Sequence, residues 1–107
     1  MPPSKSEILD IIHSKEAVLL YFKTTSCSVG EAVEPKVKTL LEQRFPKMHF
    51  KSIDMNFDAE IAAQFNAFTE PTVLVFFDGR ESIRKSRSFS IAELEENIRR
   101  LYQLFFE

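Results

Sequence analysis

Apolar residues along this chain recur with two different periods, which predict a domain that mixes helices with strands. Ile8, Ile11 and Ile12 have the spacing of one helix face, so we expect a first helix over residues 5–13. The next apolar segment, residues 17–22, is short and continuous. That pattern is typical of a strand covered on both faces.

A second helix and a second strand are predicted after the single cysteine, Cys27. Pro35 lies inside the helical pattern, and a proline there costs about 3 kcal/mol and bends the helix axis. The helix is expected to end before Pro46. Residues 48–54 then alternate well enough to predict a strand. The apolar stripe of the helix consists of Val29, Val33, Val37, Leu40, Leu41 and Phe45.

A short helix and a hairpin are predicted next. We expect the helix over residues 59–65, with Asp58 as its cap. The run from Pro71 to Phe77 has high β-propensity. A proline is allowed at the first residue of a strand, and the bond before Pro71 is a candidate cis peptide. Asp-Gly at 78–79 is a strong signal for a tight hairpin turn.

The return strand of the hairpin, from Glu81 to about Ser88, is charged. A charged strand suits the exposed edge of a sheet, although the same residues could form a docking patch for a partner. The basic residues are Arg80, Arg84, Lys85 and Arg87. Ser90 with Glu93 has capping-box spacing and begins a long final helix. The apolar stripe of that helix is Ile91, Leu94, Ile98, Leu101 and Leu104 or Phe105.

The predicted order is therefore α-β-α-β-α-β-β-α. A β-α-β unit gives two parallel strands with a right-handed crossover, and the hairpin adds two antiparallel strands. We predict an α/β fold with a four-stranded mixed sheet and helices on both faces. Its 107 residues are expected to form a single domain, 1–107.

Composition narrows the possible functions. The net charge of −2 gives no reason to expect binding to nucleic acid or to an anionic membrane. No apolar run reaches the roughly 20 residues of a spanning helix, and the first residues have no signal-peptide core, so we expect a cytoplasmic protein. His13 and His49 have no ligand partners nearby in sequence, so we expect no metal and no cofactor. We also expect a monomer.

Cys27 is the main candidate for chemistry. It lies where a buried strand gives way to a helix, and the first backbone N–H groups of a helix have no partner within it. These groups favour negative charge, so a thiol there ionises more readily, and the thiolate is the reactive form. The alternative is that Cys27 is a small buried apolar residue. A single cysteine excludes an internal disulfide and is compatible with a reducing compartment.

This arrangement resembles the thioredoxin family over nearly the whole chain. The resemblance rests on Cys27 after an apolar strand, Pro35 in the following helix, Asp54 at a strand end, Glu70-Pro71-Thr72 and Asp78-Gly79. It implies a thioredoxin-like fold from which the first strand of the family is missing. It also implies a cis bond before Pro71, with that proline facing the thiol. Without the resemblance, Pro71 reads as a plain strand-start proline and Asp54 as a strand-end capping residue.

The chain departs from the family at its motif. Where the family has Trp-Cys-Gly-Pro-Cys, residues 26–30 read Ser-Cys-Ser-Val-Gly. Gly30 thus replaces the second cysteine, and Ser26 replaces the tryptophan. The buried acid of the family falls on Tyr21, and the glycine beside the substrate groove falls near Arg87. Loss of the second thiol and loss of the acid that serves it are mutually consistent.

Two functions remain open. The first is a thiol–disulfide oxidoreductase in cell redox homeostasis, a possible monothiol disulfide reductase. Its catalytic Cys27 would form mixed disulfides with protein or low-molecular-weight substrates, and an external thiol would resolve them. The second is a non-catalytic thioredoxin-fold module that binds a protein in the groove beside Pro71. The expected groove residues are Ser26, Ser28, Val29, Gly30, Glu70, Pro71, Thr72 and Arg87.

Overall fold

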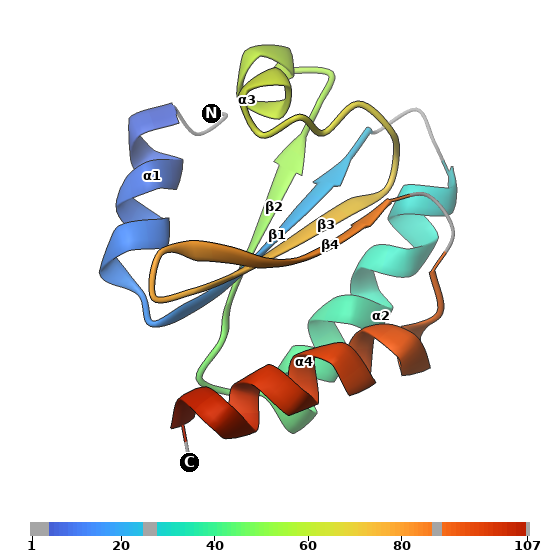
Figure 1. Ribbon diagram of the computed structural model, residues 1–107. Helices are drawn as coiled ribbons and strands as arrows, with labels where there is room; N and C mark the ends of the chain where they lie inside the picture. The colour runs from blue at the N-terminus through green and yellow to red at the C-terminus, as the bar shows by residue number, and fades with distance from the viewer. Residues whose placement is uncertain (1–4, 25–27, 87–88, 107) are drawn as a thin grey trace.

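The computed structural model describes residues 5–24, 28–86 and 89–106, and it has the predicted order of elements (Figure 1). In chain order the elements are α1 (Lys5–Ser14), β1 (Ala17–Lys23), α2 (Ser28–Arg44), β2 (His49–Asp54), α3 (Ala59–Gln64), β3 (Thr72–Phe77), β4 (Arg80–Ser86) and α4 (Ile91–Phe106). Most bounds fall within one or two residues of the expected ones.

The four strands form one mixed sheet in the order β2-β1-β3-β4. Strand β1 is parallel to β2, antiparallel strands β1 and β3 form the centre, and β4 returns antiparallel along one edge. The central strands are buried along almost their whole length, as their continuous apolar runs predicted. The predicted α/β fold class is confirmed.

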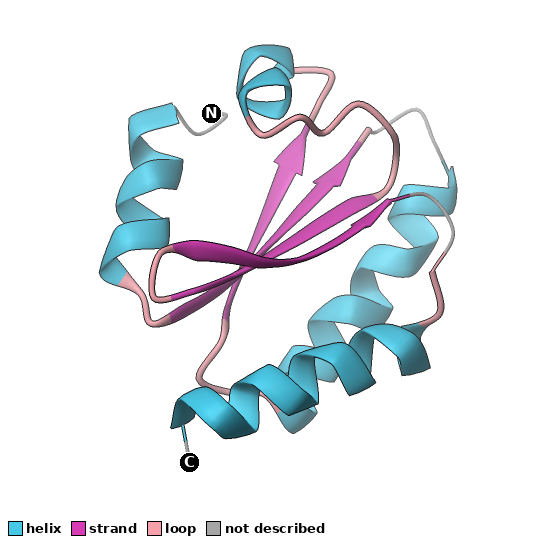
Figure 2. Cartoon of the chain, in the orientation of Figure 1, coloured by secondary structure: helices cyan, strands magenta, loops and turns pink. Residues whose placement is uncertain are grey.

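Helices cover both faces of the sheet, giving three layers (Figure 2). Because side chains alternate along a strand, consecutive residues of β1 enter different layers. Leu19 and Tyr21 pack with α2 and α4, whereas Leu20 and Phe22 pack with α1 and α3. The helices contribute buried apolar residues to these two layers, among them Val37, Leu41, Leu94 and Ile98 on one face and Ile8, Ile12, Ile61 and Ala62 on the other.

The hairpin and the last helix form as their local signals predicted. Asp78 and Gly79 have φ of 54° and 78°, the left-handed pair that a tight hairpin turn needs. Ser90 Oγ accepts a hydrogen bond from the backbone N–H of Glu93 at 2.9 Å, as a helix cap does. These two signals depend on neighbouring residues alone, which is why the sequence predicts them well.

The expectation that Asp58 caps α3 is wrong. Asp58 occupies the N-cap position of α3, but its side chain makes no capping hydrogen bond, because its backbone is not in the cap conformation. The apolar stripe of α4 does not stay buried to its end. Leu104 is 80% exposed and Phe105 is 40% exposed. Phe106, the next residue, still packs against the core, so the exposure belongs to Leu104 and Phe105 and not to the whole end of the helix.

Some expectations fall on residues outside the described ranges, namely the last two residues of the return strand, 87 and 88. Pro35 lies inside α2 on its exposed side, and the helix continues through it despite the missing N–H.

Among the described residues, the first element is α1, and no strand precedes it. None of the helices in this part of the chain is both long and apolar enough to cross a membrane.

Candidate functional site

The end of β1 meets the start of β3 at the expected site. Phe22 pairs with Thr72 across the sheet, so the residues that follow β1 lie beside those that precede β3. The carboxylate of Glu70 accepts a hydrogen bond from the backbone N–H of Thr24, and the Glu70–Pro71 peptide bond is cis. This contact joins two residues that are 46 positions apart in sequence. Thr24 itself is three residues before Cys27.

The loop before β3 also holds itself together. Thr72 is buried, and its hydroxyl donates a 2.6 Å hydrogen bond to the carbonyl oxygen of Thr69. A buried hydroxyl with a partner avoids the cost of an unsatisfied polar group. Pro71 is buried as well. Glu70, Pro71 and Thr72 therefore lie together at the end of β1.

An ion pair ties the same end of β1 to α2. The ammonium of Lys23 lies 2.6 Å from a carboxylate oxygen of Glu34, and both side chains are about four-fifths buried, with 22% and 20% exposure. The carbonyl oxygen of Lys23 also accepts a 2.7 Å hydrogen bond from the N–H of Met55. Sequence reasoning missed this pair. The alternation of β1 could have placed Lys23 on the α2 face, two residues after Tyr21.

Tyr21 stands where the resemblance expects a buried acid. Its side chain is fully buried on the α2 and α4 face of the sheet, and its ring stacks on that of Phe50 with centroids 6.2 Å apart. The neighbouring strands present Ser52 and Val73 opposite it. A phenol, unlike a carboxylic acid, keeps its proton at neutral pH. This position therefore supplies no carboxylate to a thiol.

The predicted motif residues divide into two groups. Cys27 and Ser26 lie outside the described residues, as does Arg87. The structure places Ser28, Val29 and Gly30 in the first turn of α2, which begins at Ser28. Cys27 is thus the residue directly before the helix in sequence. An α-helix of 17 residues offers free N–H groups at this end, which favour an anion.

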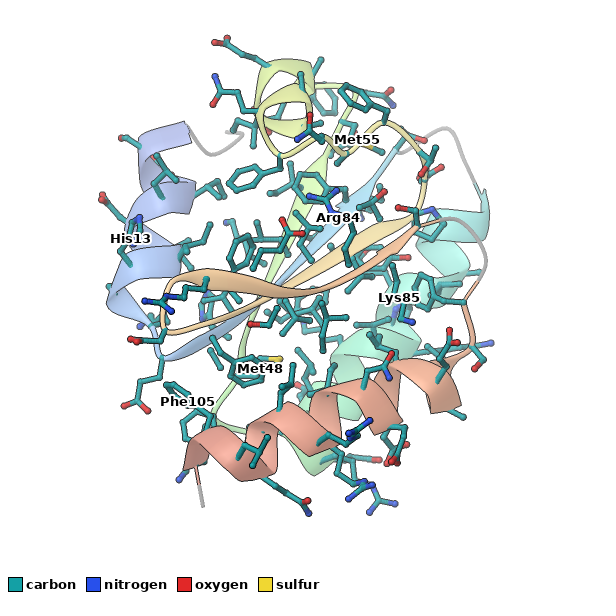
Figure 3. The ribbon with its side chains drawn as sticks, viewed as in Figure 1. His13, Met48, Met55, Arg84, Lys85 and Phe105 are labelled. Atoms are coloured by element: carbon teal, nitrogen blue, oxygen red, sulfur yellow. The ribbon has the colours of Figure 1, made fainter. Side chains whose placement is uncertain are left out.

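Arg84 is a structural residue that the sequence did not reveal. Its guanidinium donates to the carbonyl oxygens of Phe65 at 2.8 Å and Asn66 at 3.2 Å, just past the end of α3, and it pairs with Glu81. Figure 3 shows Arg84 on the α3 side of β4 and Lys85 on the α4 side. The basic run is therefore not uniform. Arg84 holds the edge strand to α3, whereas Lys85 faces the other helix layer.

Two acidic residues lie near the end of β2: Asp54 is its last residue, and Asp58 comes just before α3. Burial, and secondarily the nearby carboxylate of Asp54, raise the pKa of Asp58 above its ordinary value. One carboxylate oxygen of Asp58 is buried and makes no hydrogen bond to any described group. Asp54 accepts a 2.9 Å hydrogen bond from the backbone N–H of Asn56, so it closes the turn after β2. That contact fits the strand-end capping alternative considered for Asp54.

The two histidines lie in α1 and β2. His13, near the end of α1, lies beside the hairpin turn, where a Cβ on Gly79 would come 3.3 Å from its Nδ1. Burial lowers the pKa of His49, and the charges of Lys15 and Lys51 lower it further. Within the described ranges, no three side chains of His, Asp or Glu gather as metal ligands would.

Comparison with known proteins decides the family. The profile described as Thioredoxin matches residues 4–100. The chain belongs to the thioredoxin family. It is 33% identical over 98 residues to the thioredoxin-like protein YdfQ of Bacillus subtilis (strain 168), and the match covers 92% of this chain and 87% of that protein. Membership of the thioredoxin family supports a function of the thiol–disulfide oxidoreductase type.

Solved structures of thioredoxins agree with this assignment. Thioredoxin 1 from Thermosipho africanus TCF52B superimposes with a TM-score of 0.77 at 31% identity, covering 84% of this chain and 99% of that one. A mutant thioredoxin from Halobacterium salinarum NRC-1 gives a TM-score of 0.82 over 99% of this chain and 88% of that one. At 23% identity, the second similarity bears on the fold alone.

Proposed function

We propose that this thioredoxin-family protein exchanges thiols and disulfides through Cys27 alone. The observation that carries the proposal is the position of the single cysteine in a confirmed thioredoxin fold. It directly precedes α2, three residues after the N–H that binds Glu70. Membership of the family supports thiol chemistry at this place. The substrates would be disulfides of proteins or of low-molecular-weight thiols in a reducing, cytoplasmic setting, and the protein would act as a monomer.

The proposed reaction has two exchanges. The thiolate of Cys27 attacks one sulfur of a substrate disulfide, which forms a mixed disulfide and releases the other sulfur as a thiolate. An external thiol such as glutathione, as its thiolate, then attacks the mixed disulfide. Cys27 leaves as a thiolate, and the substrate sulfur is now bonded to the external thiol. A second molecule of that thiol reduces this product, so two external thiols are oxidised for each substrate disulfide reduced.

The described residues support the first exchange. The start of α2 favours the thiolate over the thiol. The Glu70–Pro71–Thr72 loop, held to Thr24, borders the space into which an extended substrate would bind beside Cys27. Ser28, Val29 and Gly30 belong to the same border in the proposal, and Ser26 and Arg87 complete it. The positive charge of Arg87 would aid thiolate formation modestly.

The second exchange needs the external thiol because the chain has no resolving cysteine. Gly30 stands in the first turn of α2, where the family has its second thiol. The replacement of the family acid by buried Tyr21 agrees with this loss, because the acid assists proton transfer at that missing thiol. A monothiol mechanism accounts for both changes together.

Mass spectrometry after exposure to oxidised glutathione tests the proposal. We expect one glutathione adduct on Cys27 and its removal by added reduced glutathione. A disulfide-reduction assay should show turnover with glutathione present and little without it. Cys27→Ser serves as the matched control and should form no adduct. Rapid turnover with no added thiol, or no adduct on the unmodified chain, would contradict the proposal.

A second function is favoured by the absence of a resolving thiol. The fold would hold a protein in the groove beside Pro71 without any turnover. In that case partner binding would survive Cys27→Ser. Substitution within the loop, such as Thr72→Ala, would weaken it. Loss of all binding in Cys27→Ser would instead favour the thiol mechanism.

A further inference from the structure

A groove runs between edge strand β4 and helix α4. Its volume is about 470 Å³, within the range of binding clefts. The β4 wall includes Ser82, Ile83 and Lys85, and the α4 wall includes Asn97, Arg100 and Leu101. On α4, Asn97 is followed by Arg100 and Leu101, three and four residues later, and Leu104 comes one turn after them, so these residues share one face of the helix. None of them belongs to the proposed thiol site.

The groove continues into an apolar hollow at the C-terminal end of α4. This hollow, about 190 Å³, is lined by Phe77, Leu101, Leu104 and Phe105, with Ser82 at its rim. Ser82, Leu101 and Leu104 line both spaces, so the two are continuous. The rings of Phe77 and Phe105 have centroids 5.6 Å apart and form its floor. Leu104 and Phe105 are both exposed beside this hollow, so the apolar surface is continuous there.

The other end of the groove is cationic. Arg100 is exposed and forms no ion pair with any described side chain. Lys85 lies 3.6 Å from Glu93, a long contact with a carboxylate that is 54% exposed, and such pairs stabilise little. Arg84 also lines the groove, but its guanidinium is bound to Phe65 and Glu81 on the α3 side of β4 and so does not join these charges. Arg100 is therefore available to an anionic partner, whereas Lys85, whose side chain is 25% exposed, would exchange the carboxylate of Glu93 for one from the partner.

We propose that this groove binds an acidic segment of a partner protein that also carries a bulky apolar residue. The apolar side chain would enter the hollow between Leu101 and Phe105, and carboxylates would face Arg100 and Lys85. The charge of the groove favours an acidic partner, and its open, elongated form along an edge strand suits an extended segment. β4 has a strand neighbour on its β3 side alone within the described sheet, so its outer edge borders the same groove. The proposal does not depend on the thiol chemistry.

Three labelled peptides test this surface by fluorescence anisotropy. The first alternates glutamate with leucine and phenylalanine, the second has lysine for each glutamate, and the third has serine for each apolar residue. We expect the first to bind at least about tenfold more tightly than the other two, and added salt should weaken it. Equal binding of all three peptides, or binding of none, would overturn the proposal.

Charge reversal at the groove makes the test specific. Arg100→Glu should lower the affinity for the glutamate peptide by at least about tenfold and raise the affinity for the lysine peptide. Arg99→Glu is the matched control, because Arg99 is the adjacent exposed arginine of α4, pairs with Glu96 and does not line the groove. The Arg99→Glu variant should bind the glutamate peptide as tightly as the unmodified chain does. Equal losses in the two variants would contradict the assignment.

Two further variants separate this proposal from its alternatives. Leu104→Ser should abolish binding without loss of fold, because Leu104 is exposed, and circular dichroism checks the fold. Cys27→Ser should bind the peptide as tightly as the unmodified chain. Sedimentation tests a second copy of the chain as the occupant. If the chain self-associates through Leu104 and binds no peptide, the proposal is wrong.

Discussion

The carboxylate of Glu70 accepts a hydrogen bond from the backbone N–H of Thr24, and this contact joins the cis-proline loop to the end of β1. The two residues are 46 positions apart in sequence. Their contact fixes how the loop before β3 lies relative to the chain entering the Cys27 segment. It is the most direct structural link between the two halves of the proposed site.

Removal of the Glu70 carboxylate should destabilise the fold. Glu70→Ala leaves the N–H of Thr24 without this acceptor, and hydrogen bonds to charged groups contribute about 1.5–3 kcal/mol when buried. Since this contact is part-buried, we expect a loss of about 1–2 kcal/mol in the free energy of unfolding in urea. Glu70→Gln keeps an acceptor oxygen and should lose less. Equal losses in both variants would contradict a role for the hydrogen bond.

The Lys23–Glu34 ion pair should show measurable coupling. We expect a double-mutant cycle with Lys23→Met and Glu34→Gln to give a coupling free energy of about 0.5–1 kcal/mol, since both side chains are mostly buried. Because neither is fully buried, salt should reduce the coupling. Arg44 with Glu95, at 3.6 Å and more exposed, provides a control pair whose coupling should be smaller. A larger coupling in the control pair would show that burial does not strengthen the first.

Arg84 should stabilise the end of α3 through its carbonyl bonds. Arg84→Lys keeps the charge, but it loses the planar fork that reaches Phe65, Asn66 and Glu81 together. We expect hydrogen exchange at the last amides of α3 to become several times faster, with a loss of about 1 kcal/mol in stability. Arg80→Lys, on the same strand, should leave these amides unchanged. Faster exchange in both variants would mean that the overall positive charge of β4, and not the hydrogen bonds of Arg84, protects these amides.

Asp58 should make the free energy of unfolding depend on pH in the acidic range. Because the pKa of its carboxyl is raised in the folded state, the folded protein binds the proton more tightly than the unfolded chain does. Its contribution to stability therefore falls as pH rises from the ordinary pKa of Asp, about 3.9, through the raised value. We expect Asp58→Asn to be more stable than the unmodified chain at neutral pH. The gain should disappear below the ordinary pKa of Asp.

Urea titrations of both proteins across this pH range measure the difference. Asn is as good an N-cap residue as Asp, and the side chain of Asp58 makes no capping bond, so the change removes no such contact. Glu60→Gln, an exposed change in the first turn of α3, is the control. A variant that is less stable than the unmodified chain at neutral pH would contradict the assignment.

Much of the fold could be predicted from sequence because its signals are local. The continuous apolar run of β1 gave a central strand, and Asp78-Gly79 gave the hairpin turn. Local signals predicted less well which residues of a helix are buried, because burial depends on the neighbouring elements. The stripe of α4 kept its period to Phe105, although Leu104 and Phe105 are exposed while Phe106 packs against the core. Periodicity shows which side of a helix is apolar, but it does not show how far the neighbouring sheet extends.

The candidate site could be predicted in outline and not in its contacts. The resemblance named Glu70, Pro71 and Thr72 as groove residues, and the structure places them beside the end of β1, whereas Cys27 lies outside the described residues. The partners of Lys23 and Arg84 could not be predicted. An ion pair or a side-chain hydrogen bond across the sheet depends on strand register and on which face a residue occupies. In the sequence, Arg84 looks like its basic neighbours, and the bonds to α3 distinguish it.

The pH dependence of Cys27 alkylation tests the central claim most directly. The free thiol has a pKa of about 8.5, and a thiol at the start of a helix is expected to ionise at lower pH. Reaction with iodoacetamide, followed by mass spectrometry in the native protein and in urea, gives the two titration midpoints. If Cys27 is activated as proposed, we expect a native midpoint clearly below both the free value of about 8.5 and the value in urea. A native midpoint at or above the value in urea, with slow modification at neutral pH, would contradict it.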